Sequence, residues 1–148
     1  MTGRAQEANL GLLLFIPYRS LESAVLATLR THGHDLPLSD ARVFQRISPQ
    51  GSRMSDLAVA AQLTKQTLTS IVDRLERAGY VARHTDPEDA RARVVTITGK
   101  GHELIELSTP VVRAVEADWQ RHLGSAKTDQ LRRILTELCA FTDTSLGR

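Results

Sequence analysis

The feature that most constrains the fold is a helix followed directly by two short strands, between residues 64 and 98. Thr64 is placed to cap this helix, because its hydroxyl can accept a hydrogen bond from an amide of the first turn. The apolar residues that follow have the spacing of one helix face: Leu68, Ile71, Val72 and Leu75. Gly79 after "RLERA" favours a helix end. "YVARH" and "ARVVTIT" then flank the turn-rich "TDPEDAR", which predicts a hairpin.

A shorter helix is predicted immediately before this segment. In "MSDLAVAAQL", Ser55 is placed to cap the helix, and Met54 and Val59 have the spacing of a hydrophobic staple. Gln62 lies in the tight turn between the two helices. A residue other than glycine there takes a left-handed conformation at a cost of about 1 kcal/mol, unless the turn is built differently. Two short helices joined by a tight turn and followed by a hairpin make the outline of a winged helix-turn-helix.

Helical segments are predicted on both sides of this middle block. Apolar residues recur at close to helical spacing over residues 9–30, and Pro17 is expected to kink that helix because it lacks an amide donor. "LSDARVFQRIS" predicts a short helix, and two longer amphipathic helices follow residue 98. The predicted class is mainly α with a small β-hairpin wing. Residues 37–98 form the winged helix-turn-helix, and residues 1–36 and 99–148 form a helical dimerisation region.

The composition is that of one ordinary globular domain. The chain has 148 residues, of which 41% are hydrophobic and 24% charged, so it resembles neither a disordered nor a membrane-spanning protein. Its longest apolar block, "LGLLLFIPY", is far shorter than the roughly 20 residues of a membrane span, and its first residues lack the order of a signal peptide. A single cysteine excludes an internal disulfide, which favours a reducing cytoplasm. The net charge of +2 permits nucleic-acid binding but does not indicate it.

The middle block and its surroundings resemble a known family. "LAVAAQLTKQTLTSIVDRLERAGYVARHTDPEDARARVVTITGKG" is similar to the MarR family (multiple antibiotic resistance regulators), with its "TSIVDRLERAGYV" segment, "DPEDxR" wing and "T-x-x-G" helix start. The resemblance covers about residues 9–146. It implies a cytoplasmic, homodimeric transcriptional regulator, most often a repressor, that binds a pseudo-palindromic site on double-stranded DNA. Two residues depart from the family: Gln62, where glycine is frequent, and Pro17 in the first helix.

Short polar side chains occupy the face of the second helix opposite its apolar stripe. A merely solvated helix face is usually richer in Glu and Lys, because those residues favour helix formation. Hydroxyl and amide groups instead suit a surface that approaches base edges and phosphates. The pattern alone leaves both interpretations equal, and the resemblance favours DNA binding. The contacts predicted on this helix are Thr64, Lys65, Gln66, Thr67, Thr69, Ser70 and Arg74.

The hairpin carries a second candidate contact. Alternation puts Arg91 and Arg93 on the same side as Val95 and Ile97, so the inner pair can be buried while the arginines extend past the core. For an arbitrary hairpin, a solvated turn balanced by its own acids is the better interpretation. The resemblance implies instead that Arg91 enters a minor groove, whose negative potential attracts arginine where A·T pairs narrow it. Asp89 can fix the direction of the Arg91 guanidinium by a hydrogen bond. The predicted phosphate contacts are Arg83, His84 and Arg93.

The apolar stripes of the flanking helices need a partner. The winged segment can bury one stripe of each of its own short helices, but it cannot also cover long stripes near both ends of the chain. Exposed contiguous apolar surface marks an interface, and a two-fold dimer is the commonest solution. The resemblance implies the same, with N- and C-terminal helices that interdigitate. The predicted dimer contacts are Leu10, Leu14, Leu131, Leu135 and Leu138.

A small aromatic or phenolic effector is a further implication of the resemblance. Effectors of the family commonly bind between the dimer helices and the winged segment, in a mainly apolar site with a few polar groups. General burial tendencies favour a plainer interpretation of the same aromatic residues, as core. The predicted effector residues are Phe15, Tyr18, Arg19, Phe44 and Trp119.

The remaining motifs indicate little chemistry. "TGKG" lacks the further glycines and the Lys-Ser/Thr step of a phosphate loop, so Thr98 is better interpreted as a helix cap. His32 and His34 show no ligand set of three or four, and no metal or other cofactor is predicted. Cys139 is interpreted as a core residue of the last helix. No catalytic pair of nucleophile and base is visible, so an enzyme is the poorest hypothesis. A redox- or metal-responsive switch that uses Cys139 or these histidines is the alternative to a small-molecule sensor.

Overall fold

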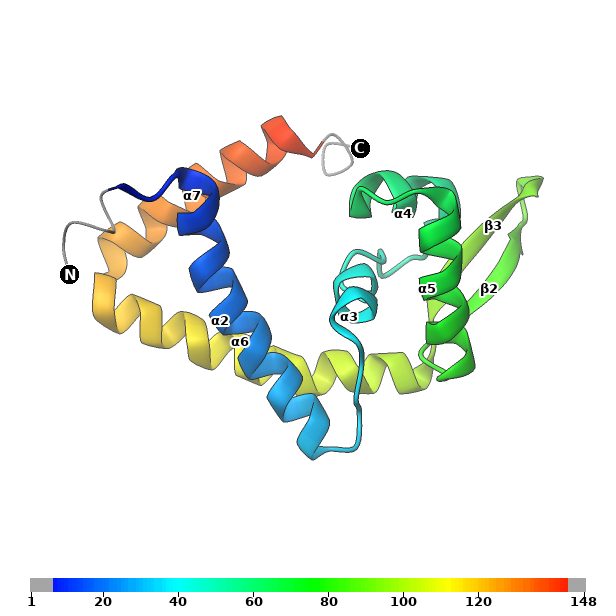
Figure 1. Cartoon of the computed structure of the whole chain (residues 1–148), viewed down its shortest axis with the longest axis horizontal. Helices are drawn as coiled ribbons and strands as arrows, with labels where there is room; N and C mark the ends of the chain where they lie inside the picture. The colour runs from blue at the N-terminus through cyan, green and yellow to red at the C-terminus, as the bar shows by residue number, and fades with distance from the viewer. Residues whose placement is uncertain (1–6, 144–148) are drawn as a thin grey trace.

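The computed structural model describes residues 7–143, and Figure 1 shows how its helices and strands are arranged. Residues 1–6 and 144–148, which the predicted helical region includes, lie outside the described residues. The elements are α2 (Leu10–Thr31), α3 (Leu38–Phe44), β1 (Ser52–Arg53), α4 (Met54–Ala61), α5 (Lys65–Arg77), β2 (Val81–Asp86), β3 (Asp89–Ile97), α6 (Gly99–Leu123) and α7 (Ser125–Thr142). The predicted class, mainly α with a small antiparallel sheet, is confirmed.

Helix α6 joins a winged part of the molecule to a helical part (Figure 1). Helices α3, α4 and α5 lie together with the sheet and form the winged part. Helix α6 begins where β3 ends and runs away from this group to the opposite end of the molecule. Helix α2 crosses and contacts α6, and α7 returns from the far end of α6 toward α4. The wing therefore lies at one end of the molecule and the α6–α7 junction at the other.

The sheet has three antiparallel strands in the order β1-β3-β2. Strand β2 pairs with β3 from Val81 opposite Ile97 toward the turn, and the register shifts at Asp86. Strand β1 lies on the other side of β3, where Ser52 pairs with Val95. The sequence predicted the hairpin but not β1, because two residues are too few to show an alternating pattern.

The core lies mainly in the winged part and includes the first turns of α6 and Leu29 near the end of α2. The apolar stripe predicted for α5 is confirmed as buried. Gly101 allows α6 to approach the sheet closely, because a Cβ there would lie only 2.2 Å from the Tyr80 carbonyl oxygen. The largest side chains with less than 2% exposure are Leu57, Leu68, Leu75, Leu104, Val43, Val72, Val81 and Val95.

Two helix caps and one turn agree with the predictions made from the sequence. The Thr64 hydroxyl accepts a hydrogen bond from the Thr67 amide at 3.1 Å, so Thr64 is the N-cap of α5 as predicted. Thr98 caps α6 in the same way through the amide of Gly101, also at 3.1 Å, which confirms the interpretation of "TGKG". Gln62 ends α4 with a φ of 55°, so a left-handed glutamine builds the turn between the two helices.

The predicted start of α4 was wrong. The helix begins at Met54, with Arg53 at the N-cap position and no side-chain cap, so Ser55 lies inside the first turn. The pairing of β1 with β3 holds Arg53 extended, and the chain enters the helix directly from that strand. The staple between Met54 and Val59 does not form either, since Val59 is 67% exposed.

Helices α2 and α7 carry apolar side chains that nothing covers within residues 7–143. Helix α2 is one helix from Leu10 to Thr31, with Pro17 inside it. Leu10 is 78% exposed, Phe141 on α7 is 83% exposed, and no residue of α7 is buried. By length and composition α2 could also span a membrane, which the block "LGLLLFIPY" alone did not indicate, but packed helices of soluble proteins meet the same criterion. An apolar helix on the surface of one chain is expected where chains associate.

Candidate functional site

The outward face of α5 is polar and exposed. The exposed side chains of its first turns are Lys65, Gln66, Thr67, Thr69 and Ser70. The Thr69 hydroxyl donates to the Lys65 carbonyl oxygen at 2.8 Å, and the Ser70 hydroxyl to that of Gln66 at 3.2 Å, which keeps both hydroxyls close to the helix. The side chains of Lys65 and Gln66 have no hydrogen-bond or ion-pair partner among the described residues. They are therefore available to an external ligand.

Arg74, on the same helix, forms an ion pair within the fold. Its guanidinium donates from Nε and Nη2 to the Asp40 carboxylate, at 3.1 and 2.7 Å. Asp40, on α3, is only 3% exposed, so Arg74 compensates a buried negative charge. The Arg74 side chain remains 45% exposed, so its predicted contact with DNA stays a prediction. Its role is to join α5 to α3.

The two predicted phosphate contacts of β2 also have partners within the fold. The Arg83 side chain is 20% exposed and pairs with Asp73 at 2.5 Å and with Glu76 at 3.0 Å, both on α5. Hydrogen bonds from Arg83 hold the pKa of the Glu76 carboxyl below its usual value. Arg83 therefore holds β2 against α5, and its predicted phosphate contact stays a prediction. His84 stays exposed, with Nε2 2.8 Å from the Thr96 hydroxyl, and remains a predicted contact.

The wing arginines are exposed, but Asp89 does not direct them as predicted. The guanidinium groups of Arg91 and Arg93 have no hydrogen-bond or ion-pair partner within residues 7–143. The Asp89 carboxylate accepts a hydrogen bond from the backbone amide of Arg91 at 3.0 Å, so the predicted bond to the guanidinium was wrong. A short Asp side chain reaches the amide two residues ahead most easily, as in many turns. Asp89 therefore shapes the backbone of the wing.

A different acid, Asp86, fixes the position of the wing. Asp86 is 8% exposed and accepts hydrogen bonds from the Glu88 amide at 2.9 Å and from Nε of Arg53 at 2.7 Å. The bond from the Glu88 amide is the largest cause of the lowered pKa of Asp86. Arg53 is the last residue of β1 and directly precedes α4, so the pair ties the hairpin tip to the helix-turn-helix. The sequence did not indicate this pair, because no periodic pattern relates residues so far apart in the chain.

A basic recess lies between the start of α5 and the wing. Its volume is about 480 Å³. The side chains that line it are mainly cationic or hydroxyl-bearing and include Arg53, Ser55, Lys65, Thr69, Arg83, Arg91 and Arg93, with Asp89 as the acid. Cations and hydroxyls between a helix and a β-ribbon suit the phosphate backbone of a nucleic acid.

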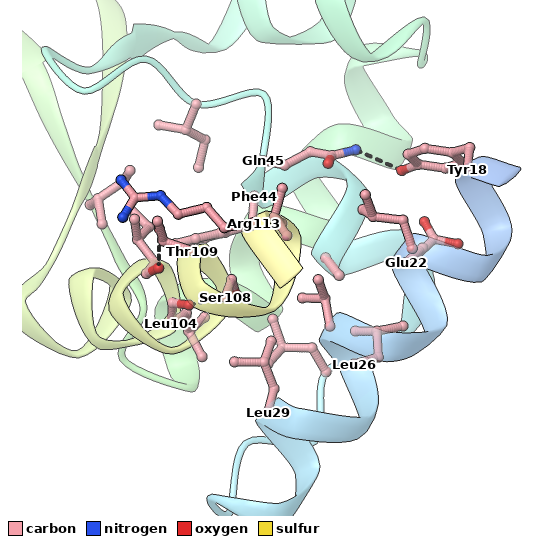
Figure 2. Close-up of a pocket in the computed structure, with 18 residues that line it drawn as sticks. Tyr18, Glu22, Leu26, Leu29, Phe44, Gln45, Leu104, Ser108, Thr109 and Arg113 are labelled. Atoms are coloured by element: carbon pink, nitrogen blue, oxygen red, sulfur yellow. Dashed lines mark hydrogen bonds between the residues drawn. The ribbon is translucent and has the colours of Figure 1, made fainter. Parts of the chain in front are cut away.

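A second cavity, mainly apolar, lies between α2, α3 and α6 (Figure 2). Its volume is about 470 Å³, and small-ligand pockets commonly measure about 300–1,000 Å³. Its apolar lining includes Leu21, Val25, Leu26, Leu29, Phe44, Leu104 and Val112. Its polar lining consists of Tyr18 and Glu22 from α2, Gln45 after α3, and Ser108, Thr109 and Arg113 from α6.

The polar groups of this cavity differ in how they are engaged. Gln45 Nε2 donates to the Tyr18 hydroxyl oxygen at 2.9 Å (Figure 2), and burial raises the pKa of Tyr18. Glu22 is 7% exposed and accepts hydrogen bonds from Arg42 at 2.9 and 3.1 Å, which lower its pKa. The Arg113 guanidinium has no hydrogen-bond or ion-pair partner among the described residues. Arg113 thus brings an uncompensated cation to a mainly apolar cavity, which suits an anionic group on a small ligand.

Of the predicted effector residues, Tyr18 and Phe44 line this cavity. Phe15 lines a separate hollow beside α4 and the end of α7. Trp119 is partly buried further along α6, and Arg19 does not line the cavity. These three residues do not line this cavity, because helical spacing does not tell which side of α2 or α6 faces α3. The polar residues that the sequence did not reveal are Glu22, Gln45, Ser108, Thr109 and Arg113.

The candidate sensing residues have structural surroundings. His34 is 8% exposed, with Nδ1 2.9 Å from the Tyr80 hydroxyl and Nε2 3.7 Å from the Glu103 carboxylate, so it links the loop after α2 to α6. Within residues 7–143, no three His, Cys, Asp or Glu side chains are grouped to hold a metal ion. Cys139 is exposed, which corrects its interpretation as a core residue.

A polar second helix, a basic wing and long outer helices define the chain as a winged helix-turn-helix regulator. It belongs to the MarR family. A sequence model described as MarR family matches residues 34–92. The HTH-type transcriptional repressor Rv2887 of Mycobacterium tuberculosis is 32% identical over 136 residues, which cover 92% of this chain and 97% of the relative.

Solved structures show the same fold. The crystal structure of NadR in complex with 4-hydroxyphenylacetate has a TM-score of 0.71 and 25% identity, and the match covers 88% of this chain and 92% of NadR. The structure of Rv2887 in complex with p-aminosalicylic acid has a TM-score of 0.62 and 29% identity, covering 88% of this chain and 98% of that one. The family and the fold predicted from the sequence are confirmed.

Proposed function

We propose that this chain is a cytoplasmic transcriptional repressor that binds a pseudo-palindromic DNA site as a homodimer. The observation that carries the proposal is the exposed polar start of α5 beside unpaired wing arginines, with a basic recess between them. In the helix-turn-helix mode, the first residues of the second helix contact base edges in the major groove. The repressor Rv2887, similar over nearly its whole length, supports the sign of regulation.

Each part of this surface has its own contact in the proposal. Lys65 and Gln66 contact base edges, because lysine can bind guanine and glutamine can bind adenine in the major groove. Arg91 enters the neighbouring minor groove, and Arg93 and His84 bind phosphates. The hydroxyl groups that contact the DNA backbone are those of Thr64, Thr67, Thr69 and Ser70.

The dimer in this proposal covers the apolar surface of α2 and α7. Leu10, Leu14, Leu131 and Leu138 are 78, 44, 40 and 41% exposed, and Leu135 is partly buried. A second copy related by a two-fold axis would remove these side chains from water. The two recognition helices would then enter major grooves about one helical turn apart, roughly 34 Å. An inverted repeat in the DNA would match this symmetry.

We further propose that a small aromatic carboxylate binds in the cavity between α2, α3 and α6 and weakens DNA binding. Arg113 pairs with the carboxylate, and the Tyr18–Gln45 pair binds a polar substituent of the ring. The ligands of the similar structures, 4-hydroxyphenylacetate and p-aminosalicylic acid, have this chemistry. A ligand weakens DNA binding only if it binds the DNA-competent conformation less tightly than another.

A titration tests both parts. DNA recovered from a random pool by the purified protein is titrated at fixed salt, with and without either acid. We expect the acid to weaken binding, and Arg113→Gln to need at least about tenfold more acid, as loss of a charged hydrogen bond implies. Arg30→Gln, outside the cavity, is the control and should respond like wild type. Failure to recover any common DNA sequence would overturn the proposed DNA recognition. If neither acid changes the DNA binding of wild type, the proposed effector site is wrong.

A further inference from the structure

An ion pair between a buried carboxylate and a half-exposed arginine ties α2 to α3 at the wall of the α2–α3–α6 cavity. Glu22 lines the cavity and is 7% exposed. Arg42 of α3 donates to it from Nε at 2.9 Å and from Nη2 at 3.1 Å, a two-pronged geometry that fixes both distance and orientation. The pair therefore links the position of α2 at Glu22 to that of α3.

A second ion pair of the same kind ties α3 to α5. Asp40, two residues before Arg42, is 3% exposed and accepts two hydrogen bonds from the Arg74 guanidinium. Helix α3 has only 7 residues, and both pairs attach to its middle, at Asp40 and Arg42. Val43 and Phe44 on the same helix are buried in the core. Helix α3 is therefore held by its ion pairs with α2 and α5 and by the packing of these two side chains.

We propose that Glu22–Arg42 and Asp40–Arg74 form a relay through α3 that couples occupancy of the cavity to the position of α5. This inference rests on the proposed function, because it assigns the cavity to the effector and α5 to DNA. Asp40 and Arg42 are positioning residues in it. Neither lines the cavity, and neither belongs to the exposed polar face of α5.

The energetics of buried charge explain why the pairs transmit movement. Separation of the buried Asp40 carboxylate from Arg74, or reduction of the partners of Glu22 to Arg19 alone, costs more than a small displacement of the helix that carries the pair. The pairs therefore move with their helices. Phe44 and Gln45 put the end of α3 on the cavity wall, where a bound ligand pushes against it.

Coupling between two sites is reciprocal, so the relay can be tested with DNA as well as with an effector. The experiment uses full-length wild type and Asp40→Asn, which keeps the size of the side chain but removes its charge. Asp35→Asn is the matched control, since it breaks an exposed pair with Arg30 (3.8 Å) off the path. Backbone hydrogen exchange of residues 19–25 in α2 is measured with and without the selected DNA.

In wild type and in Asp35→Asn we expect DNA to change exchange in this part of α2, and in Asp40→Asn we expect less than half of that change. The effect of 4-hydroxyphenylacetate on DNA affinity should be at least about fivefold in wild type and below about twofold in Asp40→Asn. Unchanged exchange of α2 in wild type on DNA binding, or full coupling in folded Asp40→Asn, would overturn the relay.

Arg42→Gln breaks the Glu22–Arg42 pair at the other end of the relay. This variant tests the relay if Asp40→Asn does not fold, because Glu22 keeps Arg19 at 3.3 Å as a partner. A relay in series also requires the double variant to lose no more coupling than either single variant, whereas independent contributions would add. If the acid has no effect but the DNA-dependent exchange of α2 disappears in Asp40→Asn, the relay stands and the proposed effector is wrong.

Discussion

Buried carboxylates decide which arginines of this chain remain available to a ligand. Asp40 holds Arg74, and Asp86 holds Arg53, while each acid is less than 10% exposed. A buried acid without its partner would destabilise the fold, so these arginines are committed. The wing arginine Arg91 pairs with no buried carboxylate. Whether an arginine has such a partner therefore distinguishes structural arginines from those proposed to bind DNA.

The first prediction concerns Arg91 and the acid that positions its strand. Arg91→Ala should weaken DNA binding by about 1–3 kcal/mol, more on A·T-rich than on G·C-rich flanks, because a narrow minor groove attracts arginine. Asp86→Ala should weaken binding in the same direction, since it frees the wing from Arg53. Titrations on both flank types at fixed salt measure these effects.

Arg93→Ala is the control for groove recognition, because loss of a phosphate contact should weaken binding about equally on both flanks. If Arg91→Ala binds both DNA sites as tightly as wild type, the wing is a solvated turn without a role in recognition.

At the scale of elements, the contacts of α2 with α3 and of α5 with β2 depend on carboxylates that are ionised. The pKa of Glu22 is lowered from 4.5, chiefly by hydrogen bonds from Arg42, and that of Glu76 from 4.5 by Arg83. A carboxyl group whose pKa is lower in the folded than in the unfolded state stabilises the fold at pH values above its unfolded-state pKa. This contribution is lost as the pH falls through its folded-state pKa. Stability should therefore fall below about pH 4.5, as these carboxylates take up protons.

Thermal unfolding between pH 7 and pH 3, followed by circular dichroism, measures this loss. Glu22→Gln should unfold at a lower temperature than wild type at pH 7 and lose less on acidification, because the variant has no proton to take up at that position. Parallel pH profiles for wild type and Glu22→Gln would show that the pair does not contribute to acid sensitivity.

Local patterns predicted the elements better than they predicted the partners between them. The cap at Thr64, the stripe of α5 and the hairpin depend on residues near one another in sequence, and all three are confirmed. Contacts such as Arg53–Asp86 and Arg74–Asp40 join residues 33 and 34 positions apart, where no periodicity applies. The exposed positions of α5 were therefore predicted correctly, whereas the pairing of Arg74 with Asp40 was not anticipated.

The two cavities illustrate the same limit. The recess beside the wing contains residues that the sequence had already selected, because the exposed faces of α5 and β3 meet there. The apolar cavity depends on how α2 and α6 rotate against α3, so only Tyr18 and Phe44 were anticipated and Arg113 was not.

For the whole molecule, exposed apolar side chains on α2 and α7 are the basis of the proposed dimer. Leu138→Asp places a charge on that surface, which is costly where the surface is buried against a second copy. We expect monomers in sedimentation velocity experiments and loss of tight DNA binding. Arg133→Asp, at an exposed polar position on another side of α7, is the control and should stay dimeric. A Leu138→Asp protein that remains a DNA-binding dimer would place the interface elsewhere.

The central claim is that two copies of α5 recognise an inverted repeat in DNA. Selection of bound sequences from a random DNA pool, repeated for wild type and Lys65→Ala, tests it most directly. Wild type should recover an inverted repeat with half-site centres about 10–10.5 base pairs apart. Lys65→Ala should lose the preference at specific positions of each half-site while it keeps weak, salt-sensitive binding to any DNA. Recovery of no common sequence by wild type, or of the same sequence with equal preference by Lys65→Ala, would contradict this account.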